Sequence, residues 1–243
     1  MTEEALLGLL NRVFVRIQRW KQGIPRGAAN VYDKLASVAV NPLHELVARD
    51  AALLKPERVV DIGCGPGDLL LELVGLEESV YCVGIDISRA MARISWRNAA
   101  RRGVRHRVDV VVADAHKLPL RHSCLDLLLS TGTLHHIRRP ADVFRECARV
   151  LKGNGEAWIY EFSHDAPRAE VGRTAREFKR PILYLKLVAA LHGLPRHEFV
   201  EGYIRRELEE AGVRYEVVYD GAVTRVVIGP RGREISKHVA VSR

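Results

Sequence analysis

The sequence predicts an α/β protein with three layers, in which a mostly parallel sheet lies between two sets of helices. From Pro56 onward, short β-branched runs alternate with helical stretches, an order typical of parallel strands joined by right-handed crossovers. The runs are almost continuously apolar, as expected of strands that are buried on both faces. With 47% apolar and 28% charged residues among 243, the composition is that of a globular domain and excludes a disordered or fibrous chain.

Residues 1–54 predict N-terminal helices that pack on the main domain. Apolar side chains recur with helical spacing over residues 3–20, at Leu6, Leu10, Val13 and Ile17. A helix lying on a membrane surface is the alternative interpretation of this stretch. Glycine and proline in residues 23–27 end the pattern, and a second helix is expected over residues 31–54, with an interruption at Asn41-Pro42.

Residues 55–229 predict the main domain. Its first five strands are expected over residues 58–62, 81–85, 108–112, 125–130 and 156–162. Two of the intervening helices carry start signals. Ser88 can cap a helix that ends near Gly103, and Pro140 can open another that stops before Gly153.

A helical insert over residues 163–200 interrupts the alternation before the sixth strand. It contains an apolar helix, expected over residues 182–194, and a basic flank. The basic residues are Arg168, Arg173, Arg176, Lys179 and Arg180. A further helix is expected near residues 199–211, ending at Gly212.

The last two strands predict an antiparallel hairpin. Two apolar-rich runs, residues 213–219 and 222–228, flank Asp220-Gly221, which is a strong signal for a tight turn. The otherwise parallel sheet should therefore end with an antiparallel strand. A basic tail follows over residues 230–243.

A glycine-rich turn follows the first predicted strand. Residues 59–68 read Val-Val-Asp-Ile-Gly-Cys-Gly-Pro-Gly-Asp and lead into a helix. Gly63 allows a sharp turn, whereas Gly65 and Gly67 let a ligand approach the backbone closely. Because open α/β sheets bind ligands at the carboxyl ends of their strands, this turn predicts a nucleotide site.

Small or acidic residues also follow the next three strands. Asp86 ends the second strand, where a carboxylate can accept hydrogen bonds from ribose hydroxyls. Asp114 follows the third strand and could accept from an adenine amino group, and Ser130-Thr131 follow the fourth. Either carboxylate alone could cap a helix or a turn instead. Four such strand ends in succession favour an adenosine site.

The turn does not match a site for a dinucleotide or a nucleoside triphosphate. Counted from Gly63, the pattern is G-x-G-x-G-D rather than G-x-G-x-x-G, and Asp68 would repel a pyrophosphate at the start of the helix. The chain also lacks the Gly-Lys-Ser/Thr of a P-loop at this turn. These features disfavour a nicotinamide-dependent oxidoreductase. A phosphate-free nucleoside that carries a sulfonium and an ammonium group fits better beside Asp61 and Asp68.

At these residues the sequence resembles the class I S-adenosylmethionine-dependent methyltransferases. Residues 59–67 are similar to the family's first motif, and residues 149–156 resemble its turn into the fifth strand. Residues 113–120 and 130–137 are similar to the subgroup that includes ubiquinone/menaquinone C-methyltransferases and many small-molecule methyltransferases. The resemblance implies a Rossmann-like sheet of seven strands with the last strand antiparallel, and S-adenosylmethionine as cofactor.

The resemblance and the residues at the strand ends together predict which residues form the cofactor site. Asp86 would hold the ribose with Ile87 against the adenine, and Tyr32 would help the N-terminal helices to close over the cofactor. The full set is Tyr32, Asp61, Gly63, Cys64, Gly65, Gly67, Asp86, Ile87, Asp114, Ala115, Ser130 and Thr131.

Two histidines, His135 and His136, follow the fourth strand on the expected substrate side. Either could act as a general base near neutral pH, since histidine titrates there. The alternative is that they shape the loop, or that one is a buried packing residue. We expect no metal site, because no third ligand lies near the pair in the sequence.

The methyl acceptor is expected to be a small molecule. The chain lacks the Asn/Asp-Pro-Pro-Tyr/Phe signature of exocyclic nitrogen methylation and the Pro-Cys or Thr-Cys pair used on cytosine. The insert could be a lid over a hydrophobic or acidic acceptor, or a helix that covers the core and has a solvated basic flank. The net charge of +8 leaves an RNA or protein acceptor as an alternative, and a non-catalytic cofactor-binding subunit is another.

The remaining features indicate a cytoplasmic protein without integral membrane association. The start of the chain is acidic where a signal peptide would be basic, and the apolar stretch at residues 182–194 is too short to span a bilayer. Four cysteines without CxxC spacing are expected to be reduced rather than zinc ligands: Cys64, Cys82, Cys124 and Cys147.

Overall fold

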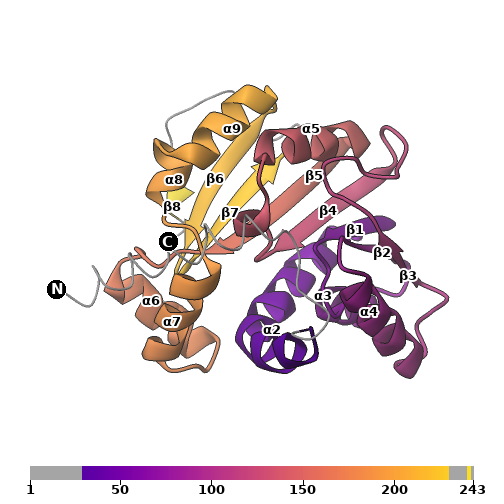
Figure 1. Cartoon of the computed structure of the whole chain (residues 1–243), viewed down its shortest axis with the longest axis horizontal. Helices are drawn as coiled ribbons and strands as arrows, with labels where there is room; N and C mark the ends of the chain where they lie inside the picture. Colours follow the sequence, from indigo (N-terminus) through magenta and orange to yellow (C-terminus); the bar gives the residue numbers. More distant parts are fainter. Residues whose placement is uncertain (1–28, 230–239, 242–243) are drawn as a thin grey trace.

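One mixed sheet runs through the centre of the protein (Figure 1). The structure, a computed structural model, describes residues 29–229 and 240–241, with side chains over residues 40–229. The described strands lie in the order β3-β2-β1-β4-β5-β7-β6-β8. They are β1 Arg58–Ile62, β2 Tyr81–Asp86, β3 Val108–Val112, β4 Leu125–Thr131, β5 Leu151–Phe162, β6 Tyr215–Asp220, β7 Val223–Ile228 and β8 Ala240–Val241.

The strand directions confirm the predicted fold class. Strands β1 to β5 pair in parallel, whereas β7 is antiparallel to both β5 and β6. The predicted hairpin joins β6 to β7 at Gly221, whose φ of 61° is a left-handed conformation that glycine adopts without strain. The short β8 pairs in parallel with β6 and extends the predicted sheet of seven strands. Strand β5 also begins earlier than predicted, at Leu151.

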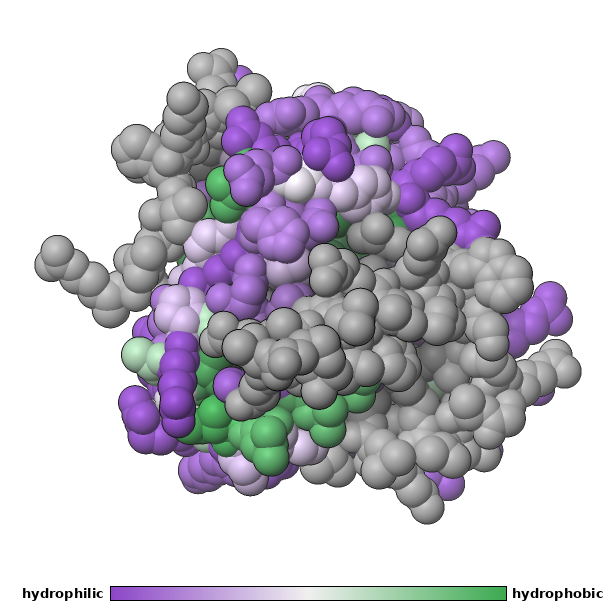
Figure 2. Space-filling view, turned by 60° about the vertical axis from the view of Figure 1, so that its left-hand side comes forward, coloured by the Kyte–Doolittle hydropathy of each residue, from purple (hydrophilic) through white to green (hydrophobic). Residues whose placement is uncertain are grey.

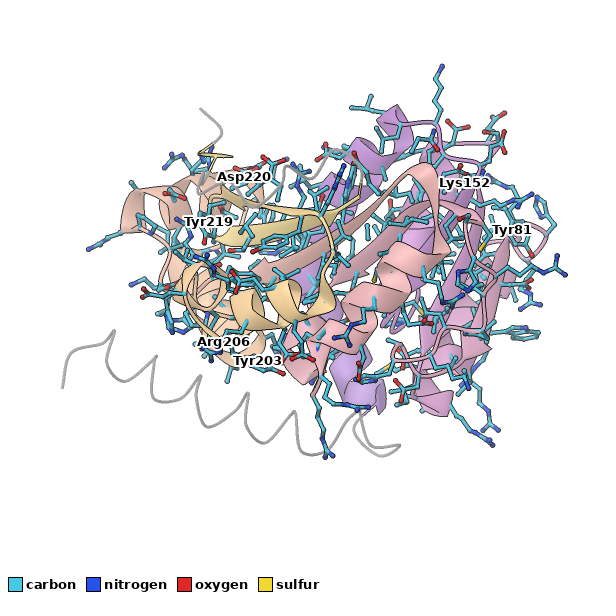
Figure 3. The ribbon with its side chains drawn as sticks, turned by 90° about the horizontal axis from the view of Figure 1, so that it is seen from above. Tyr81, Lys152, Tyr203, Arg206, Tyr219 and Asp220 are labelled. Carbon is cyan, nitrogen blue, oxygen red and sulfur yellow. The ribbon has the colours of Figure 1, made fainter. Side chains whose placement is uncertain are left out.

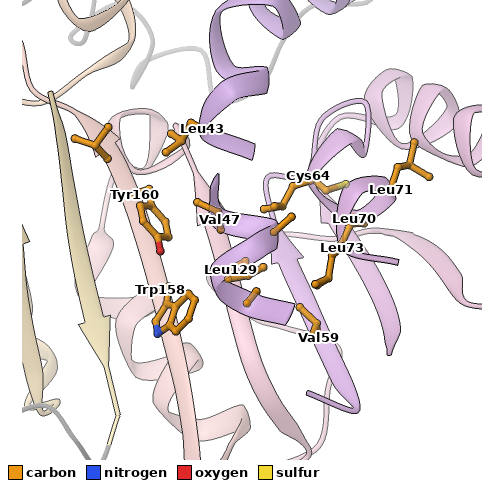
Figure 4. Packing of buried hydrophobic residues seen from close by; sticks show 14 of the residues in the cluster. Leu43, Val47, Val59, Cys64, Leu70, Leu71, Leu73, Leu129, Trp158 and Tyr160 are labelled. Carbon is orange, nitrogen blue, oxygen red and sulfur yellow. The ribbon is translucent and has the colours of Figure 1, made fainter. Parts of the chain in front are cut away.

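Helices cover both faces of the sheet. They are α2 Ala29–Leu53, α3 Asp68–Leu76, α4 Arg89–Arg101, α5 Pro140–Val150, α6 Arg168–Glu177, α7 Ile182–His192, α8 His197–Val200 and α9 Tyr203–Ala211, with a 3-10 turn, η1, at Leu134–His136. Successive residues of a strand point to opposite faces. Val59 therefore belongs to one core cluster, with residues of α2 and α3 (Figure 4) and of α6 and α7, and Val60 belongs to a second cluster, with residues of α5, α8 and α9.

Helix α2 corrects one expectation from the sequence. It continues through Pro42, so the predicted interruption at Asn41-Pro42 is wrong. Proline removes one helical hydrogen bond. The turns after it are nevertheless held by packing, since Leu43 and Val47 are fully buried in the same core cluster as the apolar side chains of α3. Burying such side chains contributes about 1.5–3 kcal/mol each, enough to offset the missing bond.

Two predicted helix starts are confirmed. The Ser88 hydroxyl caps α4 by accepting a hydrogen bond from the Met91 N–H at 3.4 Å. Pro140 occupies the first turn of α5. The helix predicted over residues 3–20, the break at residues 23–27 and most of the tail at residues 230–243 lie outside the described residues. Among the helices that are described, none is both long and apolar enough to cross a bilayer.

The insert contains α6, α7 and α8 and is tied to the end of the sheet. The Arg196 side chain pairs with Glu170 at 2.6 Å and donates to the Gly221 carbonyl at 2.6 Å. The Tyr219 hydroxyl donates to the Arg196 carbonyl at 3.2 Å, and Asp220 pairs with Arg173 at 2.7 Å. Figure 3 shows Tyr219 and Asp220 beside the insert at the end of β6.

The end of α7 is held against the end of β5. Gly193 forms a parallel bridge with Phe162, and the Leu194 N–H donates to the Phe162 carbonyl at 2.9 Å. A Cβ on Gly193 would collide with the backbone oxygens of Phe162 and Ala189, so only glycine fits at this approach. The last residue of α7, His192, is thereby fixed beside the carboxyl end of β5.

Candidate active site

A cleft lies at the carboxyl ends of the parallel strands. The turns after β1 to β4 line it, together with residues from α2, β5 and α7. Nine of the residues nominated from the sequence are among its lining: Gly63, Cys64, Gly65, Asp86, Ile87, Asp114, Ala115, Thr131 and His136. Asp61, Gly67, Ser130 and His135 lie outside this lining, and the side chain of Tyr32 lies outside the described residues.

The glycine turn is open at Gly65 and tightly packed at Gly63. Gly65 has a φ of 50°, and a Cβ built on it would meet nothing within 4 Å. A Cβ on Gly63 would collide with the Thr133 side chain across the turn. The Gly63 N–H donates to the Ile85 carbonyl at 2.7 Å, which ties the turn to β2. Gly65 is therefore the residue at which a ligand can come closest to the backbone.

Asp86 joins the glycine turn to the start of α4. Its carboxylate accepts hydrogen bonds from the Gly65 N–H at 2.9 Å and from the Ser88 N–H at 2.7 Å. The side chain is 9% exposed, and burial raises its pKa. The carboxylate thus sets the shape of the turn while it also lines the cleft.

Three nominated residues lie behind the lining and have backbone or core contacts there. The Ser130 hydroxyl donates to the Ile62 carbonyl at 3.0 Å. Gly67 precedes α3 with a φ of 88°, and a Cβ there would strike the Ser95 side chain. Asp61 is buried, and its Oδ1 has no hydrogen-bond partner among the described residues. Burial and the neighbouring Asp86 raise the pKa of Asp61 well above its usual value.

The lining is acidic at the end formed by the glycine turn and the turns after β2 and β3. It includes Asp68, Asp86 and Asp114, and among the described residues it contains neither lysine nor arginine. Asp114 is exposed, and its Oδ1 accepts a hydrogen bond from the His116 N–H at 2.9 Å and contacts the His116 ring. Such a surface attracts a cation and repels phosphate. The lysine and arginine side chains that the structure describes therefore lie outside the cleft lining.

The other end of the cleft contains a group of histidines around a buried carboxylate. His135 is fully buried, with its Nδ1 at 3.0 Å from Glu161 Oε2 and its backbone N–H donating to Oε1 at 3.2 Å. The rings of His136 and His192 lie next to it, with centroids 4.1 Å and 5.8 Å from that of His135. His136 and His192 line the cleft, whereas His135 supports them from behind.

Burial controls the protonation of this group. It raises the pKa of Glu161 to about 8 and lowers the pKa of His136 to about 2 and of His192 to about 4. The two histidines that face the cleft are therefore neutral at pH 7. A neutral imidazole of low basicity is a weak general base but retains a lone pair for other partners.

Besides His116, sequence reasoning missed two further histidines that line the cleft. His44 comes from α2, and its Nε2 lies 2.9 Å from the Thr131 hydroxyl. His192 comes from α7 and is placed by the Gly193–Phe162 bridge. Neither has a local motif. The only sequence signal for His192 was its position between an apolar helix and Gly193.

Comparisons with known proteins point to one family. A family model described as a methyltransferase domain matches residues 60–159. The malonyl-[acyl-carrier protein] O-methyltransferase of Geobacter sulfurreducens is 32% identical over 80% of this chain and 70% of its own length. The ubiquinone/menaquinone biosynthesis C-methyltransferase of Azotobacter vinelandii is 35% identical over 54% of each chain. A solved structure from Methanococcus maripaludis, described as an S-adenosylmethionine-dependent methyltransferase, has a TM-score of 0.70 at 20% identity and covers 89% of this chain and 98% of its own.

The chain belongs to the class I S-adenosylmethionine-dependent methyltransferases. It is a methyltransferase enzyme with S-adenosylmethionine as its cofactor, as the resemblance implied. This chain spans 70% of the first relative but only about half of the second.

The residues of the cleft fit this cofactor. S-adenosylmethionine carries a sulfonium and an ammonium group and no phosphate. The lining supplies three carboxylates and, among the described residues, no cationic lysine or arginine. Gly65 leaves open space at its Cβ position, and the buried Asp61 Oδ1 next to the turn is an acceptor without a protein donor in the described part of the chain.

Proposed function

We propose that this enzyme methylates a small-molecule acceptor held at the histidine end of the cleft. The observation that carries the proposal is the enclosure of this end by α2 and α7, with His44, His136 and His192 facing inward together with Phe162. A space bounded by two helices suits a compact acceptor. One relative is named for a malonyl group carried on acyl-carrier protein and another for ubiquinone/menaquinone biosynthesis, and both names indicate a small methylated group rather than RNA.

We propose that the cofactor lies along the glycine turn. Asp86 would accept hydrogen bonds from the ribose hydroxyls, and Ile87, which is 45% exposed, would pack against the adenine. Asp114 and Ala115 would border the adenine edge. Gly63, Cys64 and Gly65 would contact the methionine part, with Asp61 accepting from its ammonium group directly or through water. Thr131 would contact the methionine part from β4.

When bound, the cofactor supplies an electrophilic methyl group on a sulfonium whose departure needs no acid. The protein therefore contributes mainly position, which can supply several kcal/mol, up to about 7–11 in ideal cases. His136, which faces the cleft, would contact the acceptor. His135 would orient His136 and His192 from behind, with Glu161 fixing its ring.

We propose that the insert at residues 163–200 forms the cover of the acceptor, and that α2, the described helix of the N-terminal segment 1–54, belongs to the main domain through its packing on α3. The exposed apolar residues Ile182, Leu183 and Leu187 lie on α7, and Figure 2 shows apolar surface gathered on the side of the molecule that carries α6 and α7. The basic flank is used in part for holding the insert, through Arg173 and Asp220.

We further propose a cytoplasmic location, which the free thiols of all four cysteines support.

The lining of the cleft contains no lysine or arginine among the described residues, so it offers an RNA backbone no such side chain to bind, which disfavours RNA as the acceptor. A non-catalytic role is disfavoured because the relatives that match 80% and 54% of this chain are named as methyltransferases.

The test is a methylation assay with isotope-labelled S-adenosylmethionine against separated small-molecule, RNA and protein fractions of an extract. The proposal predicts label in the small-molecule fraction and its loss in Asp86→Ala. Label confined to RNA or protein would overturn it. So would the absence of any label from a protein that binds S-adenosylhomocysteine normally, which would indicate a binding subunit.

A further inference from the structure

Three imidazoles converge at the acceptor end of the cleft. The potential donor atoms of His135, His136 and His192 all lie within 4.8 Å of one another. Two of these residues are on η1 after β4, and the third arrives from the insert at the end of α7. This convergence depends on the tight Gly193–Phe162 contact, which leaves no room for a side chain.

We propose that His135, His136 and His192 form a binding site for one divalent transition-metal ion, with zinc the best match. Three histidines and an open fourth position are a ligand set typical of catalytic zinc. Imidazole nitrogen suits zinc, nickel, copper and iron, and it does not suit magnesium or calcium.

The Glu161 carboxylate lies behind the histidines and holds the His135 ring in place. Glu161 is 1% exposed and lies 3.0 Å from His135 Nδ1. A histidine that ligates a metal through one nitrogen usually donates its other N–H to a carboxylate, which fixes the ring and its tautomer. Glu161 also accepts from the His135 backbone N–H, so both of its oxygens are directed at this residue. Nε2 is thereby the ligating atom of His135.

The spacing allows the site to close around an ion. With bonds of about 2.0–2.1 Å, tetrahedral geometry places two ligand nitrogens about 3.3 Å apart. The donor atoms must therefore approach by at most about 1.5 Å relative to the observed limit of 4.8 Å. His136 and His192 are only partly buried, so rotation of their side chains supplies this movement, while His135 stays fixed by Glu161.

The ion would bind the methyl acceptor. This role of the ion rests on the proposed function. His136 and His192 line the cleft, so the open position faces the acceptor. An acceptor hydroxyl, carboxylate or thiol that coordinates the ion through its oxygen or sulfur would be held next to the cofactor. A coordinated hydroxyl or thiol releases its proton to solvent more readily, since a metal lowers the pKa of a bound group. No histidine then has to act as the base.

The site can be tested without any acceptor. Full-length protein without a histidine tag would be stripped with a chelator and titrated with Zn²⁺ by calorimetry and with Co²⁺ by visible absorption. We expect one ion per chain and the absorption bands of tetrahedral Co²⁺. His192→Ala and His136→Ala should each weaken Zn²⁺ binding at least a hundredfold. The matched control is His106→Ala, an exposed histidine between α4 and β3, which should bind as the wild type does.

Two outcomes would overturn the metal site. One is the absence of saturable Zn²⁺ binding by protein that is folded by circular dichroism and binds S-adenosylhomocysteine. The other is binding that survives both His192→Ala and His136→Ala, which would indicate an adventitious ion elsewhere. Zinc binding without methylation of any small molecule would leave the site standing and remove the proposed acceptor class instead.

Discussion

Gly65 offers a test of where the cofactor touches the backbone. Gly65→Ala adds one methyl group to a residue whose φ is 50° and whose Cβ would meet no protein atom within 4 Å. Gly103, at the end of α4 and outside the cleft lining, has a φ of 71° and equally open surroundings. Gly103→Ala therefore introduces the same backbone strain without approaching the ligand, and it is the matched control.

The two substitutions should have equal effects on stability and unequal effects on binding. A non-glycine residue in the left-handed region costs about 1–2 kcal/mol, so both variants should lose about that much free energy of unfolding. Only the methyl group at residue 65 would occupy space that the cofactor needs. We expect the Kd for S-adenosylhomocysteine to rise at least tenfold in Gly65→Ala, equivalent to about 1.4 kcal/mol or more, and to stay unchanged in Gly103→Ala.

Urea unfolding measures the stability of both variants, and calorimetric titration measures their affinity. The reasoning is refuted if Gly65→Ala binds S-adenosylhomocysteine as tightly as Gly103→Ala does, because the open space at Gly65 would then not be the cofactor's.

Three further predictions concern other parts of the site. Asp86→Ala should weaken S-adenosylhomocysteine binding about ten- to a hundredfold, the loss of a charged hydrogen-bond partner of about 1.5–3 kcal/mol, while Asp109→Ala at an exposed carboxylate should not. Calorimetry that gave both variants wild-type affinity would remove Asp86 from the site. Burial lowers the pKa of His44 to about 4, so the unfolded chain binds a proton between pH 6.5 and 4 that the folded chain does not. The free energy of unfolding should therefore fall as the pH falls through this window. His44→Asn should reduce the fall between pH 7 and pH 5 by at most about 2 kcal/mol. Urea unfolding at the two pH values would contradict this if the fall were the same in wild type and variant. Gly193→Ala forces a Cβ into backbone oxygens and should cost about 1–3 kcal/mol, whereas Gly153→Ala, with open surroundings, should melt near the wild-type temperature; equal melting temperatures would show that α7 is not held as described.

The sequence predicted the sheet well because its signals are local. Apolar β-branched runs, the Ser88 cap and the Asp220-Gly221 turn each depend on a few neighbouring residues, and the structure confirms them. Part of the cleft lining was predictable for the same reason. Gly63, Gly65 and Asp86 follow strands directly, and parallel strands bring their carboxyl ends to one edge.

The histidine end of the cleft could not be predicted in this way because it is assembled from distant segments. His44 lies on a helix before the first strand, and His192 ends a helix of the insert. Their position depends on the packing of α2 against α3 and on the approach of Gly193 to Phe162. The continuation of α2 through Pro42 likewise depends on tertiary burial of Leu43, which outweighs the local preference of proline.

A crystal structure of the full chain with S-adenosylhomocysteine bound tests the central claim most directly. The account predicts the ribose hydroxyls on the Asp86 carboxylate, the backbone of Gly65 against the ligand, and the sulfur directed toward the end of the cleft that His136 and His192 line. A ligand whose ribose lies away from Asp86, or whose sulfur points away from these histidines, would contradict it.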